Sequence, residues 1–348
     1  MAIRRIAIAL SAVLAVTALA AQAAPLTIKE QGSFFVGGES KTVSAPGRGP
    51  IPAQTGEITV NQMYVQYQIP MQGDRHVPVV MVHGCCLSSK TWETTPDGRM
   101  GWSEYFVRKD RSVYLADQVS RARSGFDPSA FNAVRSGDTP PAQLPTILAA
   151  THQVGWTVFR FGPKFGEVFP DEQFPIAAMD EFYKQMIPDL NSTLPQAANP
   201  TWKQMAALGV KLKGAVLMGH SESGFFPEQA ALIDAKGIKG IVSIEMPCVT
   251  DLGAEKIAVL SKIPTLVMFG DHLGDVTGGP ANWAQSFETC KTFVDQLKKA
   301  GGDAEVMHLP ALGIKGNSHM LMQDKNSDQL ADLVIAWIDR HVETKKAH

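Results

Sequence analysis

The stretch of sequence that decides the fold is GAVLMGHSESG, which runs from Gly214 to Gly224. Its apolar first half is typical of a buried strand, and a segment with helical spacing follows its second half. Small residues two positions before and two positions after Ser221 permit a sharp turn from strand to helix, which exposes the serine hydroxyl at a helix N-terminus. Ser223 takes the place of the second glycine of the G-x-S-x-G pattern, but serine is small enough for this turn. We predict that Ser221 is a nucleophile rather than part of an ordinary Ser/Gly turn.

Similar apolar runs recur along the chain, each bounded by Gly, Asp or Pro. Strands that are buried on both faces of a parallel sheet have this pattern. Segments with helical spacing lie between several of the runs, and the last of these segments, residues 328–341, has an apolar face. The predicted strands are residues 77–82, 112–116, 214–218, 240–244, 265–269 and 304–309. We therefore predict an α/β fold with a mostly parallel twisted sheet flanked by helices.

Two further regions do not follow this pattern of parallel strands and helices. Residues 33–69 alternate apolar and polar side chains with glycines between them, which predicts two antiparallel strands. Residues 124–208 have no parallel-strand signal, are rich in Pro and aromatic residues, and are too long for a plain loop. We predict that they form a mainly helical lid insertion over one edge of the sheet; the alternative is a packing subdomain without contact to the substrate. The core then comprises residues 24–123 and 209–348.

The N-terminus has the features of a secretory signal peptide over residues 1–23. Two arginines precede an uncharged apolar run of 16 residues, 6–21, and a small-x-small sequence at 21–23 completes the pattern. The run is shorter than the roughly 20 residues that a membrane-spanning helix needs. We expect export, cleavage after residue 23, and a periplasmic or secreted protein without a stable membrane anchor.

The composition excludes several classes of function. The 348 residues include 32 Lys and Arg against 34 Asp and Glu, a formal net charge of −2, and no basic run is present. A nucleic-acid-binding protein would need a basic patch, so nucleic acid is not a predicted partner. With 45% hydrophobic and 19% charged residues, the chain is also not of the disordered class. The expected partner is a small-molecule substrate.

A serine nucleophile needs a base, and the base needs an acid to orient it. In α/β-hydrolases, which carry such serine turns, the order along the chain is Ser, acid, His. His319 lies in the sequence GNSHM, residues 316–320, between the last predicted strand and the terminal helix. The other candidates fit less well, because His308 falls within a strand, His272 follows an earlier strand and His341 is on the terminal helix. We predict His319 as the base.

Two carboxylates compete for the role of the acid. Asp271 follows the predicted strand 265–269, near the position where many hydrolases keep the acid. Glu245 ends the preceding strand, and a carboxylate after a buried apolar run is either a site residue or costly to bury. Asp275 is a weaker third candidate. The residues alone do not decide between Asp271 and Glu245.

The third element of the site is the sequence VVMVHGCCL, residues 79–87. A His-Gly pair after an early strand is typical of the loop whose backbone N–H groups help to form an oxyanion hole. We expect the N–H groups of Cys85 and Glu222 to bind the oxygen of the tetrahedral intermediate. This chemistry needs no metal ion or organic cofactor, and no CxxC or HxxxH spacing accompanies His83.

The four cysteines are Cys85, Cys86, Cys248 and Cys290. Export favours disulfides, and four cysteines allow three pairings. Adjacent cysteines bridge only by closing a small ring that strains the peptide between them. Without that bridge, Cys85 and Cys86 would each need a separate distant partner. The residues alone leave the pairing open.

Four sequence features together resemble a bacterial α/β-hydrolase esterase family that carries a vicinal cysteine pair beside the oxyanion hole. They are HGCC at 83–86, TWETTPDGRMGW at 91–102, the serine turn, and GNSHM at 316–320. The resemblance covers most of the mature chain. It implies an esterase with the triad Ser221, His319 and Glu245, the acid lying after the strand that precedes the usual one. It also implies the bridges Cys85–Cys86 and Cys248–Cys290.

We therefore predict a secreted serine carboxylic-ester hydrolase that works through a Ser-His-Glu triad and an acyl-enzyme intermediate, without a cofactor. The same residues would also serve for hydrolysis of a carbon–carbon bond or for acyl transfer to an acceptor other than water. A catalytically inactive binding protein on the same scaffold is the alternative from another class of function. It predicts that a serine-reactive phosphonate leaves the protein unlabelled.

Overall fold

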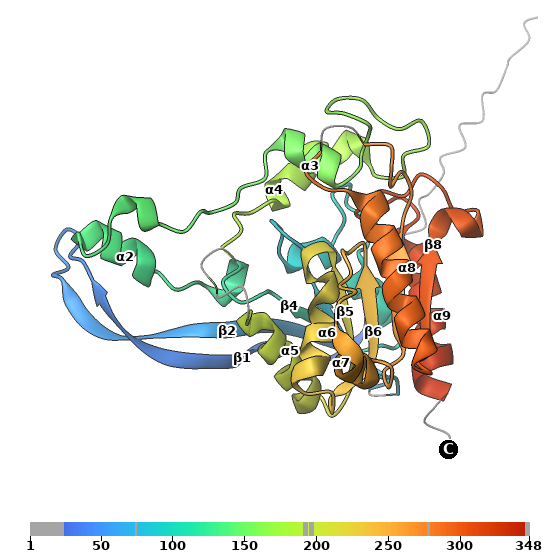
Figure 1. The fold of residues 1–348 in the computed structure, drawn as a ribbon, viewed down its shortest axis with the longest axis horizontal. Coiled ribbons are helices and arrows are strands. Elements are labelled where there is room, and N and C mark those ends of the chain that lie inside the picture. The colour runs from blue at the N-terminus through green and yellow to red at the C-terminus, as the bar shows by residue number, and fades with distance from the viewer. Residues whose placement is uncertain (1–23, 74, 191–193, 195–197, 277–278, 345–348) are drawn as a thin grey trace, which may run out of the picture.

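A computed structural model of the chain describes residues 24–73, 75–190, 194, 198–276 and 279–344 (Figure 1). The predicted signal peptide, residues 1–23, lies outside the described residues. In the described part, eight strands form one sheet in the order β1-β2-β4-β3-β5-β6-β7-β8. Their bounds are β1 Ile28–Ala45, β2 Gln54–Pro70, β3 Val79–Val82, β4 Val113–Ala116, β5 Ala215–His220, β6 Ile238–Ile244, β7 Thr265–Phe269 and β8 Ala304–His308.

The sheet is mostly parallel, as predicted. β4, β3, β5, β6, β7 and β8 pair in parallel, whereas β1 pairs antiparallel with β2, and β2 pairs antiparallel with β4. Each of the six predicted apolar runs is a strand, with ends that differ from the prediction by at most two residues. β5 extends beyond its predicted end to His220, the residue before Ser221. The parallel strands therefore end at one common edge, where ligand sites of open α/β sheets lie.

Helices cover both faces of the sheet (Figure 1). On one face pack α1 (Trp102–Arg108) and α9 (Ser327–Ile338). On the other face pack α5 (Pro200–Lys211), α6 (Phe226–Ile233), α7 (Gly253–Leu260) and α8 (Trp283–Lys299). In β3, Val79 and Met81 belong to the first layer and Val80 and Val82 to the second. A strand that is buried on both sides needs apolar side chains throughout, which explains its uninterrupted apolar sequence.

β1 and β2 form a long antiparallel hairpin that extends beyond the rest of the sheet (Figure 1). β2 pairs with β4 over residues 65–68, while β1 and β2 pair with each other along almost their whole length. Helix α2 (Ser129–Ser136) packs against β1 near the tip of this hairpin. The base of the hairpin thus pairs with the core sheet, and α2, near the start of the predicted insertion, packs against the hairpin near its tip.

Residues 124–208 contain α2, α3 (His152–Val158), α4 (Met179–Gln185) and the start of α5, with the short 3-10 helices Pro141–Gln143 and Ile176–Ala178 among their other described residues. Aromatic side chains of this region pack with α1 and α9 in one buried cluster: Trp156, Phe159, Phe161, Phe174 and Phe182. α5 instead packs against α6 on the opposite face of the sheet. The region is therefore in contact with both layers of the core, and its assignment as a lid is still a prediction.

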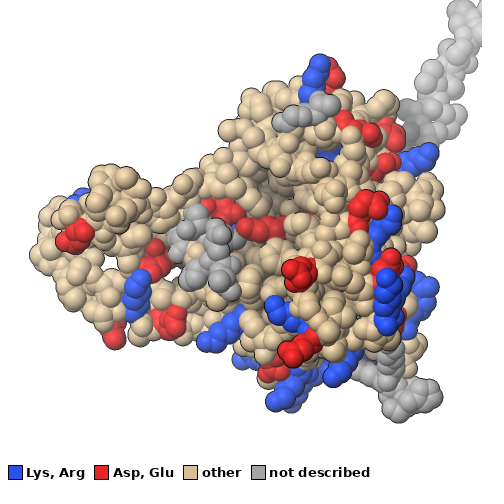
Figure 2. Space-filling view, viewed as in Figure 1, with Lys and Arg blue, Asp and Glu red and all other residues tan. Residues whose placement is uncertain are grey.

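Among the helices of the described residues, none combines the length and the apolar character that a membrane span requires. Figure 2 shows acidic and basic side chains interspersed on the face that it draws, with few of either kind over the insertion. That face therefore carries no continuous stripe of one charge.

Candidate active site

Ser221 lies at the turn between β5 and the helical segment that leads into α6. Its φ is 56°, in the left-handed region that residues with a side chain rarely adopt, and 8% of its surface is exposed. Glycines make this turn possible. A Cβ on Gly219 would lie 2.0 Å from the carbonyl oxygen of Ser223, and a Cβ on Gly224 would lie 2.3 Å from Cβ of Met246. Close packing around the serine therefore holds its backbone in a strained conformation, as is common at functional sites.

Ser223 occupies the position where the G-x-S-x-G pattern has its second glycine. Its Oγ accepts a hydrogen bond from the backbone N–H of His220 at 3.1 Å and donates one to the carbonyl oxygen of Val82 at 2.9 Å. The hydroxyl thus joins the turn to the end of β3. The departure from the usual pattern has a structural reason.

His319 lies in the loop between β8 and α9, as predicted, and is fully buried. Asp324 fixes this loop, because its carboxylate accepts hydrogen bonds from the N–H of Ser318 at 3.0 Å, from Oγ of Ser318 at 2.6 Å and from Nδ2 of Asn317 at 2.8 Å. Nε2 of His319 has no hydrogen-bond partner in the part of the chain that the structure describes. The described residues therefore show no hydrogen bond between this nitrogen and Oγ of Ser221, and the proton transfer between them stays a prediction.

His220 connects the serine turn to the histidine loop. Its ring centroid is 4.7 Å from that of His319, and its Nε2 lies 2.9 Å from the backbone carbonyl oxygen of His319. Burial lowers the pKa of His220 well below 6.5, so the ring is neutral and donates the Nε2 proton to this carbonyl. The contact holds the loop of His319 beside the residue that precedes Ser221.

Glu245 directly follows β6 and is fully buried, with a φ of 54°. Its Oε2 is 3.1 Å from Nδ1 of His319, and its Oε1 accepts a hydrogen bond from the N–H of Gly270 at 2.5 Å. Burial alone raises the pKa of Glu245, but the charge of Arg160 and the hydrogen bonds from His319 and Arg160 outweigh it and lower the pKa to about 2. The carboxylate is therefore ionised at neutral pH and accepts the Nδ1 proton of His319.

The two other candidate acids have different partners. The carboxylate of Asp271 accepts hydrogen bonds from the N–H of Gly316 at 3.0 Å and from the N–H of His272 at 2.8 Å. The carboxylate of Asp275 is 2.9 Å from Nδ1 of His272. Across the described residues, no hydrogen bond joins the carboxylate of Asp271 or Asp275 to His319. The structure thus brings Glu245 and His319 together, while Asp271 supports the loop that carries His319.

Sequence reasoning missed Arg160, which lies in the predicted insertion. Its guanidinium is fully buried and donates two hydrogen bonds to Glu245, from Nη1 to Oε2 at 2.7 Å and from Nη2 to Oε1 at 2.6 Å. Nη1 is also 3.4 Å from Nδ1 of His319, and Nε donates to the carbonyl oxygen of Asp271 at 2.9 Å. The available signal was a single arginine in the aromatic sequence FRFG, 159–162, because an arginine among buried aromatics needs a buried partner.

The loop after β3 lies directly against the serine turn. A Cβ on Gly84 would lie 2.7 Å from Cβ of Ser221, so only glycine permits this approach. Cys85 follows Gly84 and Glu222 follows Ser221, so the two predicted oxyanion donors lie next to the closest contact between loop and turn. The carboxylate of Glu222 is 3.2 Å from Nη2 of the buried Arg121. This ion pair fixes the side chain of Glu222, whose backbone N–H is one of the two predicted oxyanion donors.

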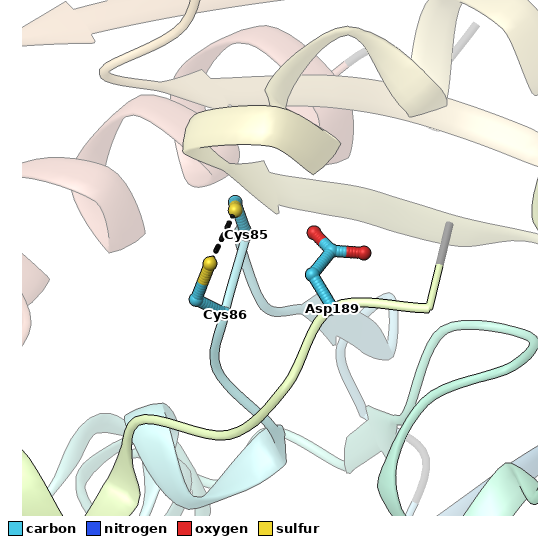
Figure 3. Close-up of side chains that lie close together, drawn as sticks. All are labelled: Cys85, Cys86 and Asp189. Carbon is cyan, nitrogen blue, oxygen red and sulfur yellow. Dashed lines mark hydrogen bonds between the residues drawn. The ribbon is translucent and has the colours of Figure 1, made fainter. Parts of the chain in front are cut away.

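Cys85 and Cys86 are the pair for which the family resemblance implies a vicinal bridge. Both are free thiols, and their Sγ atoms are 2.7 Å apart (Figure 3). A disulfide requires a separation of about 2.05 Å, so the two sulfur atoms lie close together without a bond, and the vicinal bridge stays a prediction. A disulfide does join Cys248 to Cys290, and it connects the segment after Glu245 to α8.

Asp189 lies beside the two thiols (Figure 3), and the three side chains place possible metal-ligating atoms within 4.8 Å of one another. The carboxylate of Asp189 is 2.5 Å from Nη2 of Arg121, whose side chain is also buried. The guanidinium therefore supplies the positive charge that a cation would bring. The chemistry of this donor set does not favour a metal ion.

A serine turn after a central strand of a parallel sheet, with a histidine loop before the last helix, defines the α/β-hydrolase class. No family model matches the chain. A solved structure of a novel bacterial esterase is 47% identical, superposes with a TM-score of 0.87, and is matched over 92% of this chain and 98% of the esterase. The chain belongs to the family of that bacterial esterase and is a carboxylesterase-type hydrolase.

A second relative comes from the curated proteins. It is the probable secreted lipase phiG of a fungal species (strain ATCC 74256), which is 26% identical over 324 residues, or 80% of this chain and 86% of the lipase.

Proposed function

We propose that this esterase is exported and cleaves carboxylic esters of small molecules through Ser221, His319 and Glu245, with an acyl-enzyme intermediate. The observation that carries the proposal is the 3.1 Å contact between Nδ1 of His319 and Oε2 of Glu245, together with the left-handed backbone of Ser221. The related bacterial esterase supports ester cleavage, and the secreted lipase supports export. The Cys248–Cys290 disulfide fits an oxidising compartment.

In the proposed mechanism, Nε2 of His319 removes the proton of Ser221, and Oγ of Ser221 attacks the ester carbonyl carbon. The N–H groups of Cys85 and Glu222 donate hydrogen bonds to the oxygen of the tetrahedral intermediate. His319 then gives the proton to the leaving alcohol, and the acyl group stays on Ser221. A water molecule, deprotonated by His319, attacks this acyl-enzyme and releases the acid.

The electrostatics of the site support these roles. Burial lowers the pKa of His319, while the hydrogen bond and the charge of Glu245 oppose that effect. The imidazole is therefore neutral at neutral pH and able to act as a base. Glu245 holds the tautomer with a proton on Nδ1 and stabilises the imidazolium that forms during the reaction.

Hydrolysis of a short-chain p-nitrophenyl ester tests the proposal. We expect the purified mature protein to release p-nitrophenolate, and we expect a serine-reactive phosphonate to abolish this activity by labelling Ser221, as peptide mass spectrometry would detect. A folded protein that neither hydrolyses the ester nor takes up the phosphonate would contradict the proposal and indicate a binding protein. Labelling without hydrolysis would indicate carbon–carbon bond cleavage or transfer to an acceptor other than water.

We also propose that Cys85 and Cys86 become bridged after export. The two thiols would lose two protons and two electrons to a disulfide oxidant of the exporting compartment. Their Sγ atoms, 2.7 Å apart, need only a small approach to bond. The bridge would stiffen the loop that presents the N–H of Cys85 to the reacting oxygen.

Mild reduction of the exported enzyme is accordingly expected to lower kcat, because the loop would no longer hold the N–H of Cys85 in place. Loss of one oxyanion-hole donor lowers kcat by about 10²- to 10³-fold. The measurement is turnover and free-thiol content before and after treatment with dithiothreitol. A Cys85→Ser/Cys86→Ser variant should no longer respond to the reductant, whereas the matched control, Cys248→Ser/Cys290→Ser, should still respond. Two free thiols in the untreated protein and unchanged turnover after reduction would refute the bridge.

A further inference from the structure

The predicted insertion reaches the triad through two neighbouring residues. The carbonyl oxygen of Phe159 accepts the backbone N–H of His319 at 2.9 Å, and the guanidinium of Arg160 pairs with both carboxylate oxygens of Glu245. Arg160 itself has a φ of 57°, a conformation that residues other than glycine adopt only at an energetic cost. The surrounding contacts therefore hold the guanidinium in one place.

Because the ion pair of Arg160 and Glu245 is buried, the stability of the site depends on the presence of both partners. Neither Arg160 nor Glu245 exposes any surface, and a buried charge without its partner is strongly destabilising. Each nitrogen of the guanidinium has an acceptor: Nε has the carbonyl oxygen of Asp271, and the two Nη atoms have the carboxylate of Glu245. The pair is thus hydrogen-bonded throughout and electrically neutral as a unit.

We propose that Arg160 is a positioning residue of the triad, which keeps Glu245 ionised and oriented toward His319 and thereby sets the lower pH limit of the activity. The inference rests on the proposed triad and deepens it, because it assigns part of the catalytic machinery to the insertion. Arg160 acts through Glu245 and through its charge on His319, and not on the substrate.

The charges that face His319 decide the direction of the pH effect. Glu245 favours the imidazolium, whereas the guanidinium of Arg160 disfavours it. His220, which packs against the ring, is neutral because burial lowers its pKa well below 6.5. The other rings against His319 are those of Trp283 and Phe159, which carry no charge.

Four further titratable groups lie around the Glu245–Arg160 pair: His308, Asp271, Asp324 and Glu172. Burial lowers the pKa of His308, so this ring is neutral at neutral pH. Burial raises the pKa of Asp271, but the backbone N–H groups of Gly316 and His272 outweigh it and keep the carboxylate ionised. Burial raises the pKa of Asp324 to about 7 and that of Glu172 to about 9, while the charge of Arg160 lowers both. Because Asp324 holds the His319 loop, its easier protonation in an Arg160 variant would move the acidic limb in the same direction as the changes at His319 and Glu245.

The direction follows from these charges. With Arg160 present, His319 releases its proton at a lower pH, so the neutral base persists into acidic solution. Without this cation, the pKa of His319 rises, and burial then raises the pKa of Glu245 as well. Both changes move the acidic limb of the pH profile to higher pH.

The test is the pH dependence of kcat/KM for a p-nitrophenyl ester, read at the isosbestic wavelength, in the mature enzyme and in Arg160→Met. Methionine removes the charge and retains much of the length. We expect the acidic limb of the wild type below pH 6.5, the ordinary value for histidine. In Arg160→Met we expect this limb about one unit or more higher, with a lower kcat.

Arg111→Met is the matched control, since Arg111 is also a buried arginine that pairs with two carboxylates, those of Asp339 and Glu343. These partners hold the C-terminal segment and lie outside the site, so the acidic limb should not move. A limb in Arg160→Met at the wild-type position would overturn the proposal.

Arg160→Lys decides the question if the methionine variant does not fold. One ammonium group cannot pair with both carboxylate oxygens in the geometry of the guanidinium, so we expect kcat to fall at least about tenfold with KM unchanged. A full wild-type kcat would overturn the role of Arg160. Ser221→Ala in the same assay separates the two proposals: activity in that variant refutes the triad, whereas an inactive Ser221→Ala beside an unshifted Arg160 variant refutes only the positioning role.

Discussion

Replacement of Ser221 by alanine is expected to lower kcat for ester hydrolysis by about 10⁶-fold, because the residue that would form the acyl-enzyme is lost. The remaining activity would come from the oxyanion donors and from binding, which alone accelerate such reactions by about 10³- to 10⁴-fold over water. The measurement is kcat for a p-nitrophenyl ester, with a long incubation for the variant. Phosphonate labelling should disappear at the same time.

Ser103→Ala is the matched control for this experiment. Ser103 lies in α1 and, like Ser221, exposes 8% of its surface. Its loss should leave kcat near that of the wild type. Turnover at the wild-type level in Ser221→Ala, in a preparation freed of other esterases, would disprove the serine mechanism.

The second large effect is expected for Glu245→Gln, which should lower kcat by about 10⁴-fold. The amide keeps the shape of the carboxylate but no longer stabilises the imidazolium, and its NH₂ group favours the wrong tautomer of His319. The substitution also leaves Arg160 buried without its counter-charge, so thermal unfolding should accompany the kinetic measurement.

Asp271→Asn distinguishes the two acids that the sequence left open. The carboxylate of Asp271 accepts backbone N–H groups of Gly316 and His272 and does not bond to His319, so its loss should affect stability far more than kcat. If Asp271→Asn instead lost about 10⁴-fold and Glu245→Gln retained its activity, the acid would have to be assigned to Asp271.

The fold could be predicted because its signals are local. Strands such as β3 and β7 are short apolar runs between turn residues, and burial on both faces imposes this pattern whatever the rest of the chain does. The serine turn is equally local, since Gly219 and Gly224 are needed within a few residues of Ser221. The role of Ser223 is not local, because its hydroxyl donates a hydrogen bond to the carbonyl oxygen of Val82 at the end of β3.

The choice between Glu245 and Asp271 could not be made from the residues, because both lie at the same edge of the sheet after neighbouring strands. The two carboxylates differ in which of them lies beside Nδ1 of His319, and the position of that ring depends on the whole loop before α9. The resemblance to the esterase family favoured Glu245, and the structure brings this residue to His319.

Arg160 could not be predicted for a related reason. It is 85 positions from Glu245 and lies in a region without regular patterning, so no periodicity or motif links the two. The same limit applies to α5, which falls within the predicted insertion but packs against α6 on the core. Contacts between distant segments depend on how the connections run through space.

The hairpin of β1 and β2 bears on the tendency of the protein to form fibrils. β1 is an edge strand of 18 residues, and a long edge of this kind can add strands from other molecules. Gly37 and Gly38, near the middle of the strand, have φ values of 71° and 94°, which lie outside the range of a regular strand. The charged side chains of Glu39 and Lys41 follow directly. The two glycines and the charged side chains after them thus disfavour the addition of strands from other molecules to this edge.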